Sequence, residues 1–438
     1  MNLASLKKIY DRLPYAVKAP FAKRLRNQLL NNPDFKETYE CLLMSDSIPG
    51  LEWSEERFHE VQERLLSETL SHAYFHTKYY RELFDSLGLP ADFTHPFETL
   101  KKLPLLTKET LREHLQDIIA DDGEGFEVTT GGTSGTPTTL MMSNEAHYRE
   151  WAFVYHYWSK FGYNPKTSHL ATFRGFRIGN RYSIINPMYN EIRMNIYKMN
   201  RDTIINYVRA IKKYNVDFLY GYPSAIYTFC KLAQEGDILL SGYFKGVFLI
   251  SENLLPYQKE KIEEVLRCPI AIFYGHTERA VFAGKFEEGY LPNCLYGVTE
   301  ISNSGEPIVT GFINKKTPLI RYVVDDSILP LENGYYEIEG HRKGDVLVGL
   351  NGEEISSAAT IFHDKTFEHV LTYQFHQKEV GKCDLWIVPN KQFKNEEMNA
   401  IKNSVESKFG NSIKCNVVVV DNIELTERGK YKTIVKDP

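Results

Sequence analysis

The feature that most constrains the fold of this chain is a regular alternation of predicted helices and strands between residues 203 and 273. Each predicted strand is a short run rich in apolar and aromatic residues, and the segments between strands carry apolar residues at helical spacing. The predicted helices are 203–214, 225–234 and 256–266, and the predicted strands are 218–220, 247–250 and 270–273. This alternation is typical of a sheet covered by helices, so an α/β fold is expected.

Unusual residues follow three of these predicted strands. Ligands of open α/β sheets gather beyond the carboxyl ends of the strands. A glycine turn that presents an aromatic ring, a hydroxyl and a carboxylate there can stack a base, bind a phosphate and hold Mg²⁺. The three segments are Tyr220-Gly221-Tyr222-Pro223-Ser224, Ser251-Glu252-Asn253-Leu254 and Tyr274-Gly275-His276-Thr277-Glu278. A surface position or a helix cap is the alternative interpretation of Glu278.

A glycine-rich segment, residues 129–137, precedes the alternating region. Glycine lets a ligand approach the backbone, and hydroxyl groups add donors beside exposed N–H groups, so the segment suits phosphate oxygens. A flexible turn is the alternative. The Walker pattern is not matched, because Thr136-Pro137 stands where that pattern requires lysine. A phosphate bound here would therefore need a cation from elsewhere in the chain.

Composition narrows the class of protein. The chain has 438 residues, 42% of them hydrophobic, which favours a folded enzyme with more than one domain. A formal charge of −5 argues against a dedicated nucleic-acid binder. No apolar run approaches the roughly 18 residues of a membrane span, and the first residues show no signal-peptide core, so a cytoplasmic location is expected. The six cysteines contain no C-x-x-C pair, and their spacing indicates neither a zinc site nor a disulfide framework.

The predicted organisation changes along the chain. Residues 1–120 are expected to be mainly helical, whereas the chain from Gly289 onward is expected to be rich in strands, including one over 319–324. The polar, glycine-bracketed segment 340–345 is a candidate domain boundary. About 90 residues of mixed strand and helix follow it, enough for a small second domain.

Further candidate binding residues lie near the middle of the chain. Phe173 and Arg174 belong to a loop that alternates arginine with aromatic residues, which could clamp a carboxylate or a phosphate. His147 lies on an aromatic-rich predicted helix, 143–163, where such a stripe is more often core than pocket. The candidate substrate-pocket residues are His147, Phe173, Arg174, Tyr220, Gly221, Tyr222, Pro223 and Ser224.

Taken in order, these motifs resemble those of the adenylate-forming superfamily of acyl-CoA synthetases and adenylation domains. The glycine-rich segment, Y-G-x-T-E near 274, R-Y-x-x-x-D near 321, an arginine near 342 and G-K near the end carry the resemblance. Within the superfamily, the chain is most similar to the phenylacetate-CoA ligase branch, which includes capsular-polysaccharide-biosynthesis homologues. The resemblance covers roughly residues 100–435. It implies a large N-terminal domain of several subdomains, 1–342, and a small mobile α+β C-terminal domain, 343–438.

The resemblance also implies roles for individual residues around a bound nucleotide. Tyr274 and Gly275 would flank adenine, and Asp326 would bind the ribose hydroxyls. Thr277 would reach a phosphate, and Glu278 would hold Mg²⁺. The residues implied to embrace the ATP phosphates are Thr130, Gly131, Gly132, Thr133, Ser134, Gly135 and Thr136; Ser251 and Glu252 would line the adenine site.

Further implied roles concern catalysis and domain rotation. Lys430 matches the catalytic lysine of the C-terminal domain, with Lys432 as its rival. Arg342 matches the hinge arginine, and Gly344 and Asp345 would absorb the rotation. The chain departs from the family pattern at Ile250, Val324 and His341.

The implied activity is ATP-dependent activation of a small carboxylic acid, with Mg²⁺, followed by formation of an acyl- or aryl-CoA thioester from CoA. One alternative transfers the activated acyl group to an amine, such as an amino sugar or an amino acid in surface-polysaccharide biosynthesis. A second alternative, favoured by the departures from the pattern, is a non-catalytic nucleotide-binding protein.

Overall fold

The structure is a computed structural model. It describes residues 10, 13, 15–46, 54–129, 138–176, 178–341, 346–356, 360, 362, 365–410, 412–426 and 429–436. The chain forms two compact units. The first comprises Met1–Ser168, Asn186–Asn190 and Ala271–Arg342, and the second comprises His169–Ile185, Glu191–Ile270 and Lys343–Pro438. None of the helices in the described ranges is both long and apolar enough to cross a bilayer.

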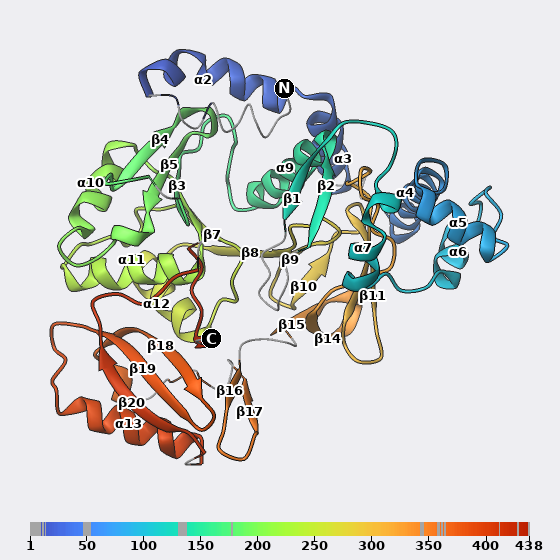
Figure 1. The fold of residues 1–438 in the computed structure, drawn as a ribbon. Helices are drawn as coiled ribbons and strands as arrows, with labels where there is room; N and C mark the ends of the chain where they lie inside the picture. The colour runs from blue at the N-terminus through green and yellow to red at the C-terminus, as the bar shows by residue number, and fades with distance from the viewer. Residues whose placement is uncertain are drawn as a thin grey trace. The chain divides into compact units, whose positions relative to one another are not determined.

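The first unit begins with helices and continues with short strands (Figure 1). Its helices are α2 (Tyr15–Leu30), α3 (Pro33–Ser45), α4 (Glu55–His76), α5 (Lys78–Ser86), α6 (Pro96–Lys102), α7 (Lys108–Glu113), α8 (Leu115–Ile118) and α9 (Asn144–Ser159). Its strands are β1 (Gly125–Thr129), β2 (Thr139–Ser143), β8 (Ile270–Gly275), β9 (Phe282–Lys285), β10 (Tyr290–Pro292), β11 (Gly297–Ile301), β12 (Pro307–Gly311), β13 (Tyr322–Val323), β14 (Asp326–Pro330) and β15 (Tyr336–His341). Short 3₁₀ turns are η1 (Pro187–Tyr189) and η3 (Glu332–Gly334).

Side-chain caps fix where the early helices begin. Ser54 accepts a hydrogen bond from the Arg57 backbone N–H, and Thr107 accepts one from that of Thr110. Each cap satisfies a backbone donor that has no partner within the helix. Serine and threonine are among the residues that most favour this cap position.

Three sheets organise the strands of the first unit. Strands run in the order β14-β15-β10-β9-β8, a second sheet has the order β11-β12-β13, and β1 pairs with β2 antiparallel. The predicted strand over 319–324 is wrong in length, because only Tyr322–Val323 is a strand. Arg321 has a φ of +51°, a left-handed conformation that cannot continue a strand.

The second unit contains the α/β alternation that the sequence predicted. Its strands are β3 (Leu170–Arg174), β4 (Ser183–Asn186), β5 (Glu191–Asn195), β6 (Phe218–Gly221), β7 (Gly246–Leu249), β16 (Val346–Val348), β17 (Glu354–Ser356), β18 (Val370–Glu379), β19 (Lys382–Pro389), β20 (Lys414–Val419) and β21 (Ile434–Lys436). Its helices are α10 (Ile204–Lys213), α11 (Pro223–Glu235), α12 (Pro256–Leu266) and α13 (Glu397–Lys408), with 3₁₀ turns η2 (Ile196–Lys198) and η5 (Lys365–Phe367). The three helices and two of the three strands predicted between residues 203 and 273 are present here, and the third predicted strand, 270–273, is β8 of the first unit.

Strands of the first half of this unit run in the order β7-β6-β3-β5-β4. Strand β3 pairs parallel with both β5 and β6, and β6 pairs parallel with β7. Helix α11 packs against β3 and β6 (Figure 1). Parallel strands buried in this way end at one edge of the sheet, and that edge is where ligands of α/β folds bind.

The C-terminal part of the second unit is a four-stranded sheet with one helix. The strand order is β20-β19-β18-β21, and α13 packs against β20 (Figure 1). Alternate residues of the strands turn inward, so Phe375, Leu385 and Ile387 meet Ile401 and Val405 of α13 in one buried cluster.

Lys231 joins α11 to the C-terminal sheet and gives a prediction about stability. Its Nζ donates a hydrogen bond to the Val370 carbonyl oxygen at 2.6 Å, and burial lowers the pKa of Lys231 to about 8. The unfolded chain takes up this proton near pH 10.5, whereas the folded chain does not until about pH 8. Charging Lys231 in the folded chain therefore lowers the free energy of unfolding as the pH falls from 10.5 to about 8. The full loss of stability is present below about pH 8.

We expect Lys231→Met to remove this pH dependence. The free energy of unfolding of the variant, relative to the parent, should be higher at pH 7.5 than at pH 10.5 by about 3 kcal/mol. Urea unfolding of both proteins across this range measures the difference. Parallel stability curves would show that Lys231 does not titrate abnormally.

Candidate active site

Some predicted site residues lie outside the described residues. β1 ends at Thr129, and β2 begins at Thr139, its register partner. The glycine-rich residues 130–136 lie between these strands in the sequence and are outside the described part, as are Arg342, Gly344 and Asp345. The candidate domain boundary at 342/343 falls there too. The roles of these residues stay predictions.

Tyr274, His276 and Asp326 form one cluster in the first unit. Tyr274 Oη donates a hydrogen bond to Asp326 Oδ2, and His276 Nε2 lies 3.0 Å from the same oxygen. Asp326 is only 3% exposed. The neighbouring Asp325 instead forms an ion pair with Lys108 at 2.5 Å. Tyr274 and Asp326, which the sequence analysis assigned to the same nucleotide, are therefore brought together by the end of β8 and the start of β14.

The chemistry of Tyr274 is set by its surroundings. Burial, with a further contribution from the Asp326 carboxylate, raises the pKa of Tyr274 well above its usual value. The phenol therefore keeps its proton and remains a donor to Asp326. The ring is half-buried and makes edge contacts with His276 and Tyr336. It is thus a fixed aromatic surface beside a carboxylate.

Glu278, the predicted metal ligand, lies just beyond this cluster. Its side chain is 9% exposed, and its Oε1 accepts a hydrogen bond from Tyr322 Oη at 3.3 Å. Burial and the Glu278 carboxylate raise the pKa of Tyr322, which keeps the phenol a donor. Gly275 and Thr277 are exposed on the same turn. The turn therefore presents a hydroxyl to solvent and holds a carboxylate beneath it.

Two opposite charges that influence one another, those of Glu150 and Arg279, were not predicted from the sequence. The Arg279 guanidinium lies near the Glu150 carboxylate of α9, which also accepts a hydrogen bond from Tyr296 Oη. Burial raises the pKa of Glu150, although the Arg279 charge and the Tyr296 hydrogen bond oppose that rise. Residues this far apart in the chain carry no local signal of their pairing.

Two glycines make room for the backbone that follows Glu278. Arg279 has a φ of +54°, and Gly297 and Gly311 are register partners of β11 and β12. A Cβ on Gly311 would lie 2.8 Å from Ala280 Cα, and one on Gly297 would lie 2.8 Å from Ala280 O. Any larger residue at these positions would displace the turn.

Arg174 and two tyrosines lie at the strand ends of the second unit. Arg174 Nη1 lies 3.3 Å from Tyr220 Oη, and its guanidinium carbon is 5.6 Å and 5.9 Å from the ring centroids of Tyr220 and Tyr222. Nearby on β5, Arg193 pairs with Glu191 at 3.0 Å. The Arg174 guanidinium thus lies beside two tyrosines at the end of β3, which suits an anionic ligand.

Gly221 and Phe173 have structural reasons for their identity. A Cβ on Gly221 would lie 2.1 Å from the Phe173 carbonyl oxygen. Phe173 is fully buried, with its ring centroid 5.0 Å from that of Phe229 on α11. The Phe173 side chain therefore packs in the hydrophobic core, and its burial gives no support to the predicted role in a substrate pocket. Tyr222 and Pro223 are also buried, at the start of α11.

Glu252 connects two predicted site segments of the second unit. Its Oε2 accepts the Ser224 backbone N–H at 3.1 Å, and its Oε1 accepts the Tyr431 backbone N–H at 2.8 Å. Burial raises the pKa of Glu252, although these hydrogen bonds and the Lys430 charge lower it. Ser251, just before it, is exposed and has a φ of +69°. Lys430 is therefore held near the carboxyl ends of the parallel strands.

Close packing of Gly429 also fixes the backbone next to Lys430. We call the contact of Glu252 with Tyr431 and the packing of Gly429 on Gly175 together the seat of Lys430. Gly429 has a φ of +75°, and a Cβ there would lie 2.5 Å from Gly175 Cα and 2.8 Å from Tyr197 Oη. The backbone of the lysine segment thus rests directly on the residue that follows Arg174. Only glycine permits both this conformation and this approach.

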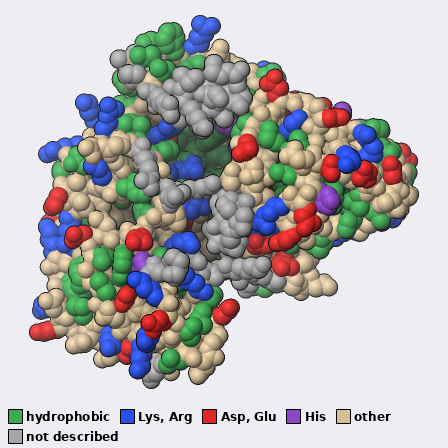
Figure 2. All heavy atoms as spheres, in the orientation of Figure 1, with side chains coloured by type: hydrophobic (Ala, Val, Ile, Leu, Met, Phe, Trp, Pro, Cys, Tyr) green, Lys and Arg blue, Asp and Glu red, His purple; other side chains and the backbone are tan. Residues whose placement is uncertain are grey.

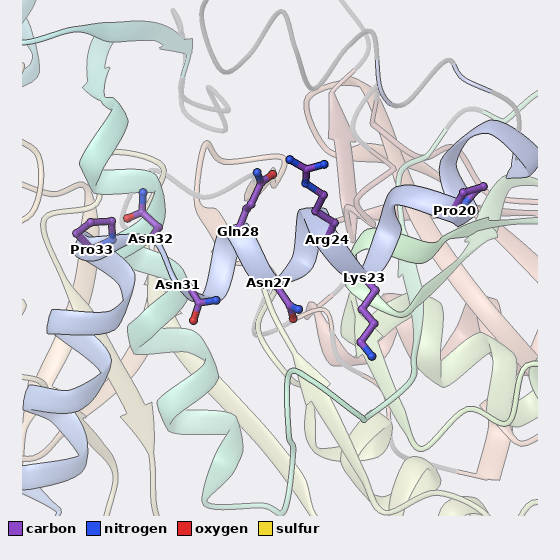
Figure 3. Close-up of a pocket in the computed structure, with 8 residues that line it drawn as sticks. All are labelled: Pro20, Lys23, Arg24, Asn27, Gln28, Asn31, Asn32 and Pro33. Atoms are coloured by element: carbon purple, nitrogen blue, oxygen red, sulfur yellow. The ribbon is translucent and has the colours of Figure 1, made fainter.

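His147, the remaining predicted pocket residue, and two surface hollows lie in the first unit. His147 is 9% exposed on α9. A hollow of about 810 Å³ lies along α2, where Arg24 and Gln28 project from the opposite side of the helix to Lys23 and Asn27 (Figure 3). A smaller one of about 180 Å³ lies between α3 and α4. Neither is lined by a predicted site residue, so the site rests on the contacts described above.

The sequence matches two protein-family models and is similar to one known protein over most of its length. The sequence model of the AMP-binding enzyme family matches residues 126–304, and that of the CapK C-terminal domain matches residues 347–437. Protein CapK of Staphylococcus aureus is 22% identical over 410 residues, covering 86% of this chain and 89% of that protein.

Solved structures of 2-hydroxyisobutyryl-CoA ligase share the fold. The structure in the postadenylation state with 2-HIB-AMP has a TM-score of 0.63 at 16% identity, over 88% of this chain and 90% of that one. The structure with 2-HIB-AMP and CoA in the thioesterification state has a TM-score of 0.51 at 17% identity, with the same coverage.

The fold and the two matched family models agree on one class: residues 126–304 match the AMP-binding enzyme family, and the chain has the fold of the adenylate-forming ligases. It has the α/β fold of an adenylate-forming ligase with a distinct C-terminal domain. Its C-terminal region and a relative matched over most of the chain are both similar to CapK.

Proposed function

We propose that the protein is an ATP-dependent ligase that joins a carboxylic acid to AMP and then transfers the acyl group to CoA. The observation that carries this proposal is the seat of Lys430. Glu252 accepts the backbone N–H of Tyr431, and Gly429 packs on Gly175, beside Arg174 and the strand ends. A lysine held there lies where an α/β fold binds ligands.

The charges of the site suit this reaction. A carboxylate is a weak nucleophile toward the α-phosphorus of ATP because both are anionic, so positive charge near the reacting atoms lowers the barrier. The Lys430 ammonium group supplies such a charge. Glu278 is a nearly buried carboxylate, and carboxylate oxygens are the ligands that Mg²⁺ prefers, so it fits the predicted metal role. Mg²⁺, when bound, would neutralise charge on the phosphates.

The Tyr274 and Asp326 cluster suits the nucleoside. Asp326 already shares one oxygen between Tyr274 and His276, which fixes the carboxylate in place. A fixed carboxylate can accept hydrogen bonds from ribose hydroxyls, and the Tyr274 ring offers a face for the adenine base.

CoA is the favoured acyl acceptor because the solved structures of the same fold include a ligase with acyl-AMP and CoA. An amine acceptor is the second candidate. It is kept because residues 347–437, the part that would admit the acceptor, match the CapK C-terminal domain.

One experiment separates the two acceptors. The protein is incubated with ATP, Mg²⁺ and a panel of carboxylic acids, with CoA, an amino sugar or an amino acid, and pyrophosphate release and product mass are measured. A thioester formed only with CoA supports the first proposal. An amide formed without CoA would replace it with the second.

Arg174 gives a prediction about the acid. Its guanidinium is held by Tyr220 and faces two aromatic rings, an arrangement that prepares it for an anionic group of the substrate. We expect Arg174→Gln to raise the KM for the acid about 10- to 100-fold, because a hydrogen bond to a charged group is lost. Arg201→Gln is the matched control, since Arg201 pairs with Glu235 instead. An unchanged KM in Arg174→Gln would remove Arg174 from the acid site.

A further inference from the structure

Two histidines on α4 face the same way as a pair of aspartates from a different segment. His72 and His76 are four positions apart in the sequence, so they share one face of the helix, and their ring centroids are 4.8 Å apart. Asp121 and Asp122 lie between α8 and β1. The cluster is within the first unit and shares no residue with the candidate active site.

Nitrogen and oxygen atoms converge in this cluster. His72 Nε2 lies 3.1 Å from Asp122 Oδ1, and His76 Nδ1 lies 3.9 Å from Asp122 Oδ2. One ligand atom from each of His72, His76 and Asp122 lies within 4.8 Å of the others. A tetrahedral ion with bonds of about 2.1 Å holds its ligands about 3.4 Å apart, so small side-chain rotations would suffice. Asp121 Oδ1 lies 3.0 Å from His76 Nδ1 and could serve as a fourth ligand atom for the ion.

The backbone that carries the aspartates is fixed by other contacts. Lys316 Nζ donates to the carbonyl oxygens of Ala120, Asp122 and Gly123 at 2.7, 2.8 and 3.0 Å. The Asp121 backbone N–H donates to the His76 carbonyl oxygen at 2.9 Å. The donors are therefore presented by a helix and by a clamped segment, as a metal site requires.

Solvent access is sufficient for an ion to enter. The side chain of His72 is 12% exposed, whereas those of His76 and Asp122 are 39% and 44% exposed. One side of the cluster is therefore buried and the other faces water, which can supply a remaining ligand.

We propose that His72, His76 and Asp122 form a binding site for a divalent transition-metal ion, with Zn²⁺ as the ion it takes. Two imidazoles and a carboxylate are ligands that suit Zn²⁺. The ion would join α4 to the segment that leads into β1. The proposal is independent of the proposed function.

The test uses the full-length chain freed of metal with a chelator. Titration with Zn²⁺ by calorimetry gives stoichiometry and affinity, and titration with Co²⁺ gives visible absorption bands that report tetrahedral coordination. We expect one site, and we expect His76→Gln and Asp122→Asn each to weaken Zn²⁺ binding at least about tenfold. His76 and Asp122 are partly exposed, so these substitutions leave the core intact.

His59→Gln is the matched control, because His59 is an exposed histidine of the same helix outside the cluster. It should leave both the affinity and the Co²⁺ spectrum unchanged. Equal Zn²⁺ affinity in the parent and in the double variant His72→Gln/His76→Gln would overturn the proposal, as would a parent that binds no Zn²⁺. A loss of binding in His59→Gln equal to that in His76→Gln would also overturn it.

Discussion

Replacing Lys430 with alanine is expected to lower carboxylate-dependent ATP–pyrophosphate exchange by about 10²- to 10³-fold, the usual effect of removing one preorganised group that stabilises developing charge. The segment that carries Lys430 is held by the Glu252 carboxylate through the backbone N–H of Tyr431. Because this contact uses the backbone, the alanine variant keeps the segment in place and loses only the ammonium group. Exchange of labelled pyrophosphate into ATP, measured with saturating acid, reports the adenylation step alone.

Lys432→Ala is the matched control for this prediction. Lys432 is two residues further along and is held through its carbonyl oxygen, which accepts a hydrogen bond from Gln374 Nε2 at 2.8 Å. The substitution leaves that contact unchanged, so a loss of exchange below about tenfold is expected. A larger loss in Lys432→Ala than in Lys430→Ala would transfer the catalytic role to Lys432. Unchanged exchange in both variants would favour a protein that does not use this lysine segment in catalysis.

Replacing Gly429 with alanine is expected to reduce the same exchange at least about tenfold while Lys430 itself is retained. The left-handed conformation costs a non-glycine residue roughly 1–2 kcal/mol, and the added Cβ would meet Gly175 at 2.5 Å. The lysine segment would therefore leave its seat in much of the population. Each 1.4 kcal/mol of that cost lowers the rate about tenfold.

Gly410→Ala is the matched control for Gly429→Ala. It carries the same kind of backbone strain but leaves the seat of Lys430 unchanged. Gly410 also has a positive φ, +59°, but a Cβ there would have no atom within 4 Å. It should lower the thermal midpoint and leave exchange near the parent rate. Acyl transfer from a chemically prepared acyl-adenylate is expected to persist in Gly429→Ala, because that step does not require the seated lysine. Equal losses of exchange in the two glycine variants would contradict the proposed seat.

Local sequence patterns predicted much of the fold. The helices and strands between residues 203 and 273 were predictable because apolar spacing distinguishes a helix from a strand within a single window. The strand predicted over 319–324 failed at Arg321, where the conformation is set by its surroundings: its guanidinium pairs with Glu300, and its backbone N–H donates to Thr310 Oγ1.

The candidate site was predictable in part. Tyr274 and Asp326 could be assigned to one nucleotide from motif order, and the structure brings them into contact. The contact of Glu252 with Tyr431 was not predictable, because it joins residues 179 positions apart through a backbone N–H that any residue possesses. The same holds for the Glu150 and Arg279 charges, which meet only after α9 packs behind the turn.

One face of the molecule carries charged side chains of both signs. Lysine and arginine side chains are interspersed with aspartate and glutamate over the visible face (Figure 2).

In the proposed reaction a carboxylate oxygen is transferred to the α-phosphorus of ATP, and isotope labelling tests that step most directly. The acid selected by the panel is prepared with ¹⁸O in its carboxylate and converted with unlabelled ATP and the acceptor, and the nucleotide product is analysed by mass spectrometry. Attack of the carboxylate on the α-phosphorus releases pyrophosphate, and later cleavage of the acyl–oxygen bond leaves one ¹⁸O in AMP. Labelled AMP is the predicted result. Unlabelled AMP, or ADP with the label in inorganic phosphate, would contradict the account.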